Sequence, residues 1–109
     1  MSRLFLGVFT AAALLASGAV QAADLEAAKK KVSEICQACH GMDGNSQVPD
    51  YPKLAGQNQD YLAKTLRDYK SGARKDPTMN GFAGTLTAQD IDNLAAYFSS
   101  QPAVLQSRM

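Results

Sequence analysis

The sequence predicts an all-α domain over residues 23–109, with three main helices and irregular loops between them. Three observations lead to this fold class. Apolar residues recur at helical spacing in three segments, and glycine and proline cluster in the two segments that separate them. No segment shows the alternation of apolar and polar residues that is typical of a half-buried strand. A chain of 109 residues is also short enough to form a single domain.

Residues 1–22 have the layout of a secretory signal peptide. Arg3 gives a short basic start, an uncharged and mostly apolar run covers residues 4–16, and small and polar residues lead up to Ala22. The apolar run is shorter than the roughly 20 residues that span a bilayer. We therefore expect cleavage after Ala22, export of the remaining chain, and no stable membrane insertion afterwards.

The predicted mature segment, residues 23–109, is close to neutral, and it is short enough that its hydrophobic core must be small. The whole chain carries a net charge of +1, so charge gives no reason to expect a nucleic-acid partner. A domain this small commonly depends on a disulfide, a metal or a cofactor. A bond between its only two cysteines, Cys36 and Cys39, would close a tiny loop and add little stability. We therefore expect a bound cofactor.

The first helix is predicted to begin at Asp24, whose residue type favours the N-cap position. Its apolar residues fall within one arc of the helix, which is the face expected to be buried. Both cysteines of the chain lie on that face. The face consists of Leu25, Ala28, Val32, Ile35, Cys36 and Cys39.

Two loops and a second helix follow. Glycine and proline mark residues 41–56 as a loop, the second helix is predicted over residues 58–71, and Gly72 ends it. A second loop is predicted over residues 73–86. The side chains of the second helix that we expect to be buried are Tyr61, Leu62, Thr65, Leu66 and Tyr69.

The last helix has the clearest start signal in the chain. Thr87 and Asp90 have the spacing of a capping box, and Leu86 and Ile91 occupy the positions of a hydrophobic staple. Apolar residues at helical spacing then give this helix one face for the core. That face is expected to comprise Ile91, Leu94, Ala95 and Phe98.

Residues 36–40 read Cys-Gln-Ala-Cys-His, which is the attachment pattern of c-type haem. Two thiols spaced along one helical turn can add to the two vinyl groups at one edge of the porphyrin. The adjacent imidazole can then bind the iron. We expect one haem c per chain, bound covalently through Cys36 and Cys39, with His40 as an axial ligand of the iron.

Other interpretations of the cysteine pair are weaker. A thioredoxin-like redox motif lies among alternating strands and helices, which this sequence does not predict. A zinc site needs about four ligands, whereas the chain offers two cysteines and one histidine. The pair could also be two buried cysteines beside a surface histidine. The predicted export signal and the small helical chain favour haem attachment.

A methionine sulfur commonly fills the second axial position of haem iron and raises its reduction potential. Met42 is too close to His40 along the chain to reach the opposite face of the ring easily, and Met109 is the last residue. Met79 lies in the glycine- and proline-containing second loop and is therefore the expected ligand. The alternative is that Met79 only fills a gap in the packing of that loop.

With these features the sequence resembles class I cytochrome c. It is most similar to small bacterial mono-haem members of the cytochrome c-553 type and to single domains of periplasmic dihaem cytochromes c. The resemblance rests on Cys-Gln-Ala-Cys-His-Gly at 36–41, Pro-Lys-Leu-Ala-Gly-Gln at 52–57, the segment leading to Met79, and Ala-Ala-Tyr-Phe at 95–98. It implies the small cytochrome c fold, with loops wrapped around one covalent haem, and a periplasmic location.

The resemblance also implies two contacts. In that family a proline carbonyl shortly after the haem motif accepts a hydrogen bond from the iron-binding imidazole, and Pro49 best matches that position, with Pro52 second. The first and last helices of the family cross at a close contact. Here the crossing is expected to bring Val32 and Ile35 against Leu94 and Tyr97.

The function implied is electron transfer. A soluble carrier of single electrons, with no substrate turnover of its own, would meet its donor and acceptor proteins in short-lived complexes. A locally basic group of side chains could steer an acidic partner, or it could be an ordinary solvated helix face. This group comprises Lys53, Lys64, Arg67, Lys70, Arg74 and Lys75.

Two other functions remain open from the sequence. The chain could be a dedicated electron-transfer subunit of a periplasmic redox enzyme complex, which would purify as a stable stoichiometric assembly. It could also be a haem sensor or enzyme with an open iron position, which would bind carbon monoxide rapidly when reduced. Ligation of the iron by Met79 would exclude the sensor or enzyme.

Overall fold

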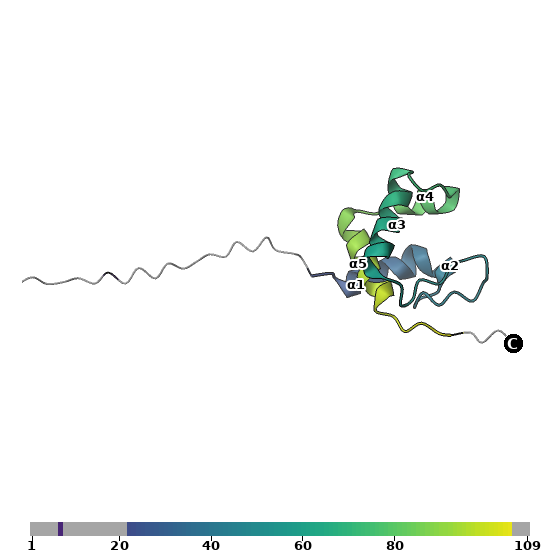
Figure 1. Cartoon of the computed structure of the whole chain (residues 1–109), viewed down its shortest axis with the longest axis horizontal. Coiled ribbons are helices and arrows are strands. Elements are labelled where there is room, and N and C mark those ends of the chain that lie inside the picture. The colour runs from purple at the N-terminus through teal and green to yellow at the C-terminus, as the bar shows by residue number, and fades with distance from the viewer. Residues whose placement is uncertain (1–6, 8–21, 106–109) are drawn as a thin grey trace, which may run out of the picture.

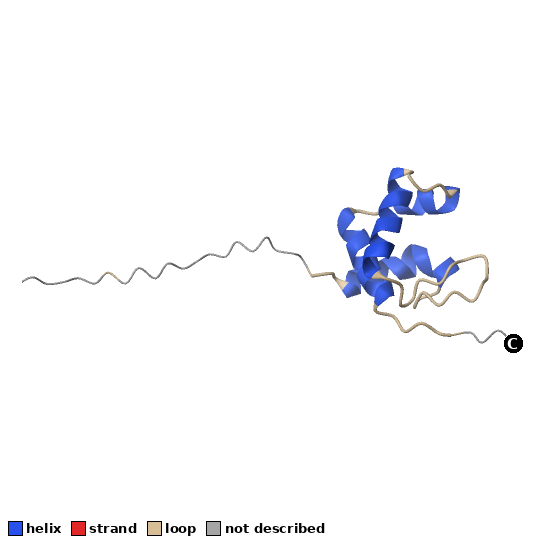
Figure 2. Ribbon diagram, in the orientation of Figure 1, coloured by secondary structure: helices blue, strands red, loops and turns tan. Residues whose placement is uncertain are grey.

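The computed structural model describes Gly7 and residues 22–105 (Figure 1). Most of the predicted signal peptide, like Met109, lies outside the described residues. The described secondary structure is helical and contains no strand (Figure 2), which confirms the predicted all-α class. No described helix is long and apolar enough to cross a membrane. The elements are α1 (Leu25–Lys31), η1 (Val32–Cys36), α2 (Gln37–His40), α3 (Gln59–Ser71), α4 (Pro77–Gly84) and α5 (Ala88–Ser99).

The first predicted helix exists, but its hydrogen-bonding pattern changes along its length. Asp24 caps it as expected, with a carboxylate oxygen accepting a hydrogen bond from the backbone N–H of Ala27 at 2.9 Å. The middle segment, η1, is π-helical and leads directly into the α-helical turn that ends at His40. Short π-helical segments are frequent at functional sites. The helix therefore widens immediately before and at the first cysteine of the haem motif.

The core lies where α1 and η1 meet α5. The largest fully buried side chains are Val32, Ile91 and Leu94, each of which contributes about 1.5–3 kcal/mol by leaving water. Tyr97 is buried in the same cluster, and Ile35 packs against it. The predicted crossing of the first and last helices is therefore present between α1 and α5, and the four residues predicted for it belong to this core or pack against it. Lys31 and Asp90 add an ion pair between these helices at 3.9 Å.

The start of α5 also follows the prediction. The Thr87 hydroxyl accepts a hydrogen bond from the Asp90 N–H, and the Asp90 carboxylate accepts one from the Thr87 N–H, both at 3.0 Å. The staple residues Leu86 and Ile91 are both buried. The capping box and staple therefore fix the angle at which the chain enters α5.

The second helix, α3, begins one residue later than predicted. The side chain of Asn58 caps it, and Gly72 ends it in a left-handed conformation, with φ of +85°. Leu62 is buried as expected, but the expectation for Tyr61 is wrong, because that side chain is 50% exposed. Several of the expected core residues of α3 instead line a cavity.

The prediction of a loop throughout residues 73–86 is wrong in its second part, where the chain forms α4. Asp76 caps this helix by accepting a hydrogen bond from the Met79 N–H at 3.1 Å, and Pro77 occupies the first turn. An N-cap residue followed by proline is a recognisable start signal. Two glycines within the helix masked it, because glycine lowers helix propensity by about 0.8–1.0 kcal/mol.

Candidate haem site

A cavity of about 340 Å³ lies between the haem motif, the loop over residues 41–57, α3 and α4. Pockets for small ligands and cofactors commonly have volumes of roughly 300–1,000 Å³. In Figure 1, α4 lies above α2, and both extend to the same side of α3. Cys36, Cys39, His40 and Met79 all line this cavity, whereas Pro49 does not. The fold thus brings together four of the five residues predicted for the site.

His40 is the last residue of α2, and its side chain is only 8% exposed. Its Nδ1 lies 2.9 Å from the carbonyl oxygen of Pro52. A carbonyl can only accept a hydrogen bond, so Nδ1 carries the proton and donates it to Pro52. Nε2 of the neutral ring then keeps the lone pair that a metal requires.

The carbonyl partner of His40 corrects one prediction. Pro49 was expected to supply it, with Pro52 second, and the structure places Pro52 there. The reason is a turn between the two prolines, closed by a hydrogen bond from the Tyr51 N–H to the Val48 carbonyl at 3.1 Å. Pro49 lies in this exposed turn, away from the imidazole. The backbone comes within hydrogen-bonding distance of His40 only after the turn, at Pro52.

The two cysteines are unpaired and half-buried. Burial raises the pKa of the Cys36 thiol to about 11, an effect that the nearby charge of Lys31 partly offsets. The thiol therefore stays protonated at neutral pH, whereas thioredoxin-like chemistry needs a readily formed thiolate. Among the described residues, no three His, Cys, Asp or Glu side chains come together as a zinc site would require.

The two methionines described near the haem motif occupy different environments. Met79, on the first turn of α4, is half-buried and lines the same cavity as His40. Met42 packs against the core and lines a separate hollow beside Gln37 and Asn45. Met79 is therefore the methionine that shares the cavity with the imidazole.

Sequence reasoning missed several residues of the cavity wall. Tyr51, Tyr61 and Phe82 line the cavity and are 40%, 50% and 41% exposed. The Arg74 guanidinium lies 4.9 Å from the centre of the Tyr69 ring. A hydrogen bond with Arg74 also lowers the pKa of Tyr61. For Phe82 the sequence does contain a signal. Met79 and Phe82 are three residues apart, which places both on one face if the segment is helical, and the structure shows that it is.

These residues fit a covalently bound haem. Two thiols, an imidazole whose Nδ1 is hydrogen-bonded, and a thioether are the protein groups that hold a c-type haem with two axial ligands. The exposed aromatic side chains are apolar surface that a flat, apolar ligand in the cavity would cover. Fold and site together define a c-type haem protein.

Comparison with known proteins identifies the family. Residues 25–102 match the family model of cytochrome c, and the chain belongs to that family. The crystal structure of reduced recombinant cytochrome c4 from Pseudomonas stutzeri has a TM-score of 0.71 and 46% sequence identity, over 77% of this chain and 48% of that one. The cytochrome c fold and the resemblance to a single domain of a dihaem cytochrome are confirmed. The family also supports haem c as the cofactor, and the spacing of Cys36 and Cys39 agrees with it.

Curated relatives differ in how much of their length this chain spans. Cytochrome c4 of Stutzerimonas stutzeri is 48% identical over 73% of this chain, but only 42% of that relative is covered. Cytochrome c-554(548) of Halomonas halodenitrificans is 41% identical over 73% of this chain and 99% of its own length. The chain thus spans less than half of this cytochrome c4 and nearly all of the shorter relative.

Proposed function

We propose that this chain is a periplasmic carrier of single electrons that uses one covalent haem c and exchanges electrons with redox proteins in short-lived complexes. One observation carries the proposal: a buried imidazole and a methionine side chain line one cavity beside the two attachment cysteines. When bound, the haem supplies Fe(II)/Fe(III) exchange. Protein ligands at both axial positions would leave no place for a substrate, so we expect no turnover of its own.

Each site residue has a separate role in this proposal. Cys36 and Cys39 would hold the porphyrin through thioether bonds. His40 would bind the iron through Nε2, while the Pro52 carbonyl fixes the tautomer and orientation of the ring and raises its basicity. Met79 would supply the second axial ligand, whose sulfur raises the reduction potential.

Apolar residues of α3 and α5 would keep water away from the haem. Leu62, Leu66, Leu94 and Phe98 all line the cavity, and they belong to the hydrophobic core or pack against it. Burial and low solvent exposure are among the factors that set haem potentials. The core that stabilises the fold thus also forms one wall of the redox site.

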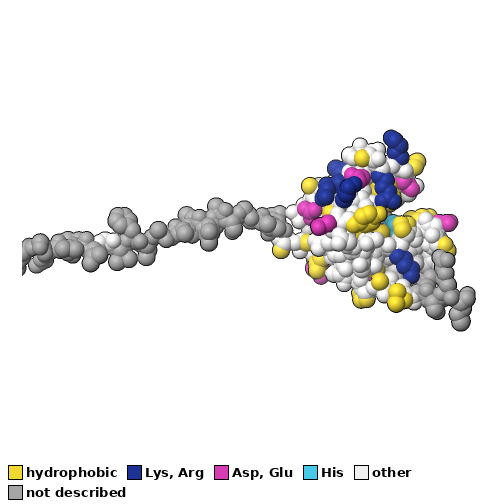
Figure 3. All heavy atoms as spheres, viewed as in Figure 1, with side chains coloured by type: hydrophobic (Ala, Val, Ile, Leu, Met, Phe, Trp, Pro, Cys, Tyr) yellow, Lys and Arg dark blue, Asp and Glu magenta, His cyan; other side chains and the backbone are white. Residues whose placement is uncertain are grey.

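Some of the basic side chains that could attract an acidic partner are already paired with carboxylates of this chain. Figure 3 shows Lys and Arg side chains gathered toward the α3–α4 end of one face. Lys64 pairs with Asp68, however, and Arg67 lies 4.0 Å from Asp92. Lys70 keeps its positive charge, because it donates to uncharged backbone carbonyls. With two of the six basic side chains paired, we expect electrostatic steering toward partners to be weaker than six unpaired charges would give.

The proposal is tested on protein made together with haem-maturation machinery. Haem that stays attached after denaturation, together with one reversible one-electron wave in voltammetry, would support it. Slow binding of carbon monoxide by the reduced protein would also support it, since both axial positions would be filled. Rapid binding would instead favour a sensor or enzyme. Purification as a stable stoichiometric complex would favour the dedicated enzyme subunit.

A further inference from the structure

The helix that carries Met79, α4, buries little apolar surface against the rest of the protein. Ala83 is its one buried residue, and Phe82 is 41% exposed. Helices shorter than about 12–15 residues are marginal in water by themselves, and the two glycines of α4 weaken it further. Other contacts must therefore keep this helix against α3.

The side chain of Asn80, the residue after Met79, binds three backbone groups. Its Nδ2 donates hydrogen bonds to the carbonyls of Tyr69 and Arg74, both at 2.8 Å. Its Oδ1 accepts one from the N–H of Asp76 at 2.9 Å. Asn80 thereby joins the last turn of α3, the turn that follows it and the N-terminus of α4. Its hydrogen bond to the Tyr69 carbonyl adds to the one that this carbonyl accepts from the Gly72 N–H at 3.3 Å.

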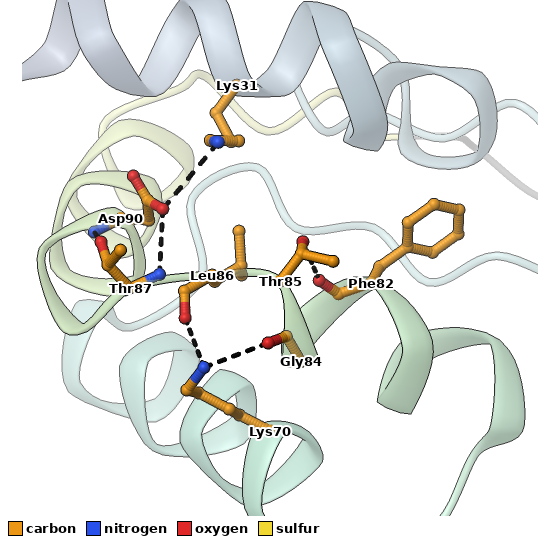
Figure 4. A network of polar contacts seen from close by, with 8 residues as sticks. All are labelled: Lys31, Lys70, Phe82, Gly84, Thr85, Leu86, Thr87 and Asp90. Atoms are coloured by element: carbon orange, nitrogen blue, oxygen red, sulfur yellow. Dashed lines mark hydrogen bonds and ion pairs between the residues drawn. The ribbon is translucent and has the colours of Figure 1, made fainter.

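Lys70 holds the opposite end of α4. Its ammonium group extends from α3 and donates to the carbonyl of Gly84 at 3.2 Å and to that of Leu86 (Figure 4). Gly84 is the last residue of α4, and Leu86 is buried in the core. A positive charge beside the C-terminal carbonyls of a helix is also favourable electrostatically.

We propose that Asn80 and Lys70 are positioning residues for Met79. They clamp the two ends of α4 to α3, and so they set how often the methionine sulfur leaves the iron. This inference rests on the proposed ligation by Met79. Loss of either clamp lets α4 move away from the cavity while His40, on the other wall, keeps its contact with Pro52.

The test compares three variants of the haem-loaded protein. Asn80→Ala removes one clamp, and Lys70→Met removes the other while keeping an unbranched apolar side chain. Lys64→Met is the matched control, because Lys64 is on the same helix but pairs with Asp68. The readouts are the rate of carbon monoxide binding to the reduced protein, which reports opening of the iron–sulfur bond, and hydrogen exchange of the α4 amides.

We expect Asn80→Ala and Lys70→Met each to bind carbon monoxide about tenfold faster, the factor that corresponds to about 1.4 kcal/mol. The control should stay within about twofold of wild type, as expected for loss of an exposed ion pair. Exchange of the α4 amides should rise in the two clamp variants and not in the control.

Two outcomes would overturn the inference. Clamp variants that are less stable to denaturant but bind carbon monoxide at the control rate would show that these residues serve the fold alone. If Asn80→Ala yields no folded protein, Lys70→Met decides the question from the other end of α4. A wild-type protein without methionine ligation would instead overturn the proposed ligation, and this inference with it.

Discussion

The cavity wall that carries His40 and the wall that carries Met79 are fixed in different ways. His40 is buried, and the loop after it contacts α5 through a backbone hydrogen bond from the Gly56 N–H to the Phe98 carbonyl at 3.0 Å and through the close approach of Gly44 to the Phe98 ring. The helix of Met79 depends on a few side-chain hydrogen bonds made by Asn80 and Lys70. We therefore expect substitutions that add bulk to destabilise the wall that carries His40. Removal of a single polar side chain should be enough to free α4 from α3 in the wall that carries Met79.

The largest effect is expected at Gly44, in the loop after His40. Its φ is +78°, and a Cβ there would lie 2.8 Å from both the Ala55 nitrogen and a ring carbon of Phe98. Gly44→Ala should cost roughly 2–5 kcal/mol, because left-handed strain and overpacking add. The measurement is the free energy of unfolding in denaturant.

Gly72→Ala, after α3, is the matched control for that substitution. Gly72 also has a positive φ, of +85°, but no atom lies within 4 Å of a Cβ built there. Only backbone strain remains, so the cost should be about 1–2 kcal/mol. Equal destabilisation by the two substitutions would show that the loop is not tightly packed against α5.

A smaller effect is expected at Asn45, which fastens the C-terminal segment over the same loop. Its Nδ2 donates to the Pro102 carbonyl at 2.8 Å, and its Oδ1 accepts from the Val104 N–H at 2.7 Å. Asn45→Ala should lower the free energy of unfolding by about 1–2 kcal/mol. Carbon monoxide binding should stay unchanged, in contrast to Asn80→Ala. Faster binding would contradict the separation of the two walls.

Tyr97 provides a comparable test from α5. Its hydroxyl donates to the Met42 carbonyl at 2.7 Å and so connects this helix to the residues just after His40. Tyr97→Phe should cost about 0.5–1.5 kcal/mol, the usual net value of one hydrogen bond. The fraction of methionine-ligated protein in the absorption spectrum should not change, whereas a drop would mean that the two walls are coupled.

The smallest effect concerns docking. Lys64 and Arg67 face carboxylates, so added salt should change the rate of electron exchange with an acidic partner protein only modestly. The check is the exchange rate measured across ionic strength by stopped flow. A steep fall with salt would restore the basic group to a main role in steering.

Local patterns predicted the His40 wall better than the Met79 wall. The Asp24 cap and the capping box at Thr87 need only short-range rules, and both appear as expected. The choice of Pro52 over Pro49 depends on the path of a turn, which residue spacing does not determine. The contacts of Lys70 join a side chain to distant carbonyls, so no periodicity reveals them.

Two further differences have local causes. A π-helical turn preserves the helical direction and inserts no glycine or proline, so η1 leaves no composition signal. Tyr61 and Tyr69 repeat at helical spacing as core residues do, yet they line the cavity. Periodicity identifies the inward face of a helix but not whether protein or a cofactor covers it.

The two-wall arrangement requires Met79, and not Met42, to bind the iron. In a reduced, low-spin haem protein, the ring current shifts the methyl protons of an axial methionine far upfield in the proton NMR spectrum. We predict one such methyl resonance in the wild-type protein, retained in Met42→Leu and lost in Met79→Ala. Absence of the resonance from the wild type, or its loss in Met42→Leu alone, would contradict the assignment.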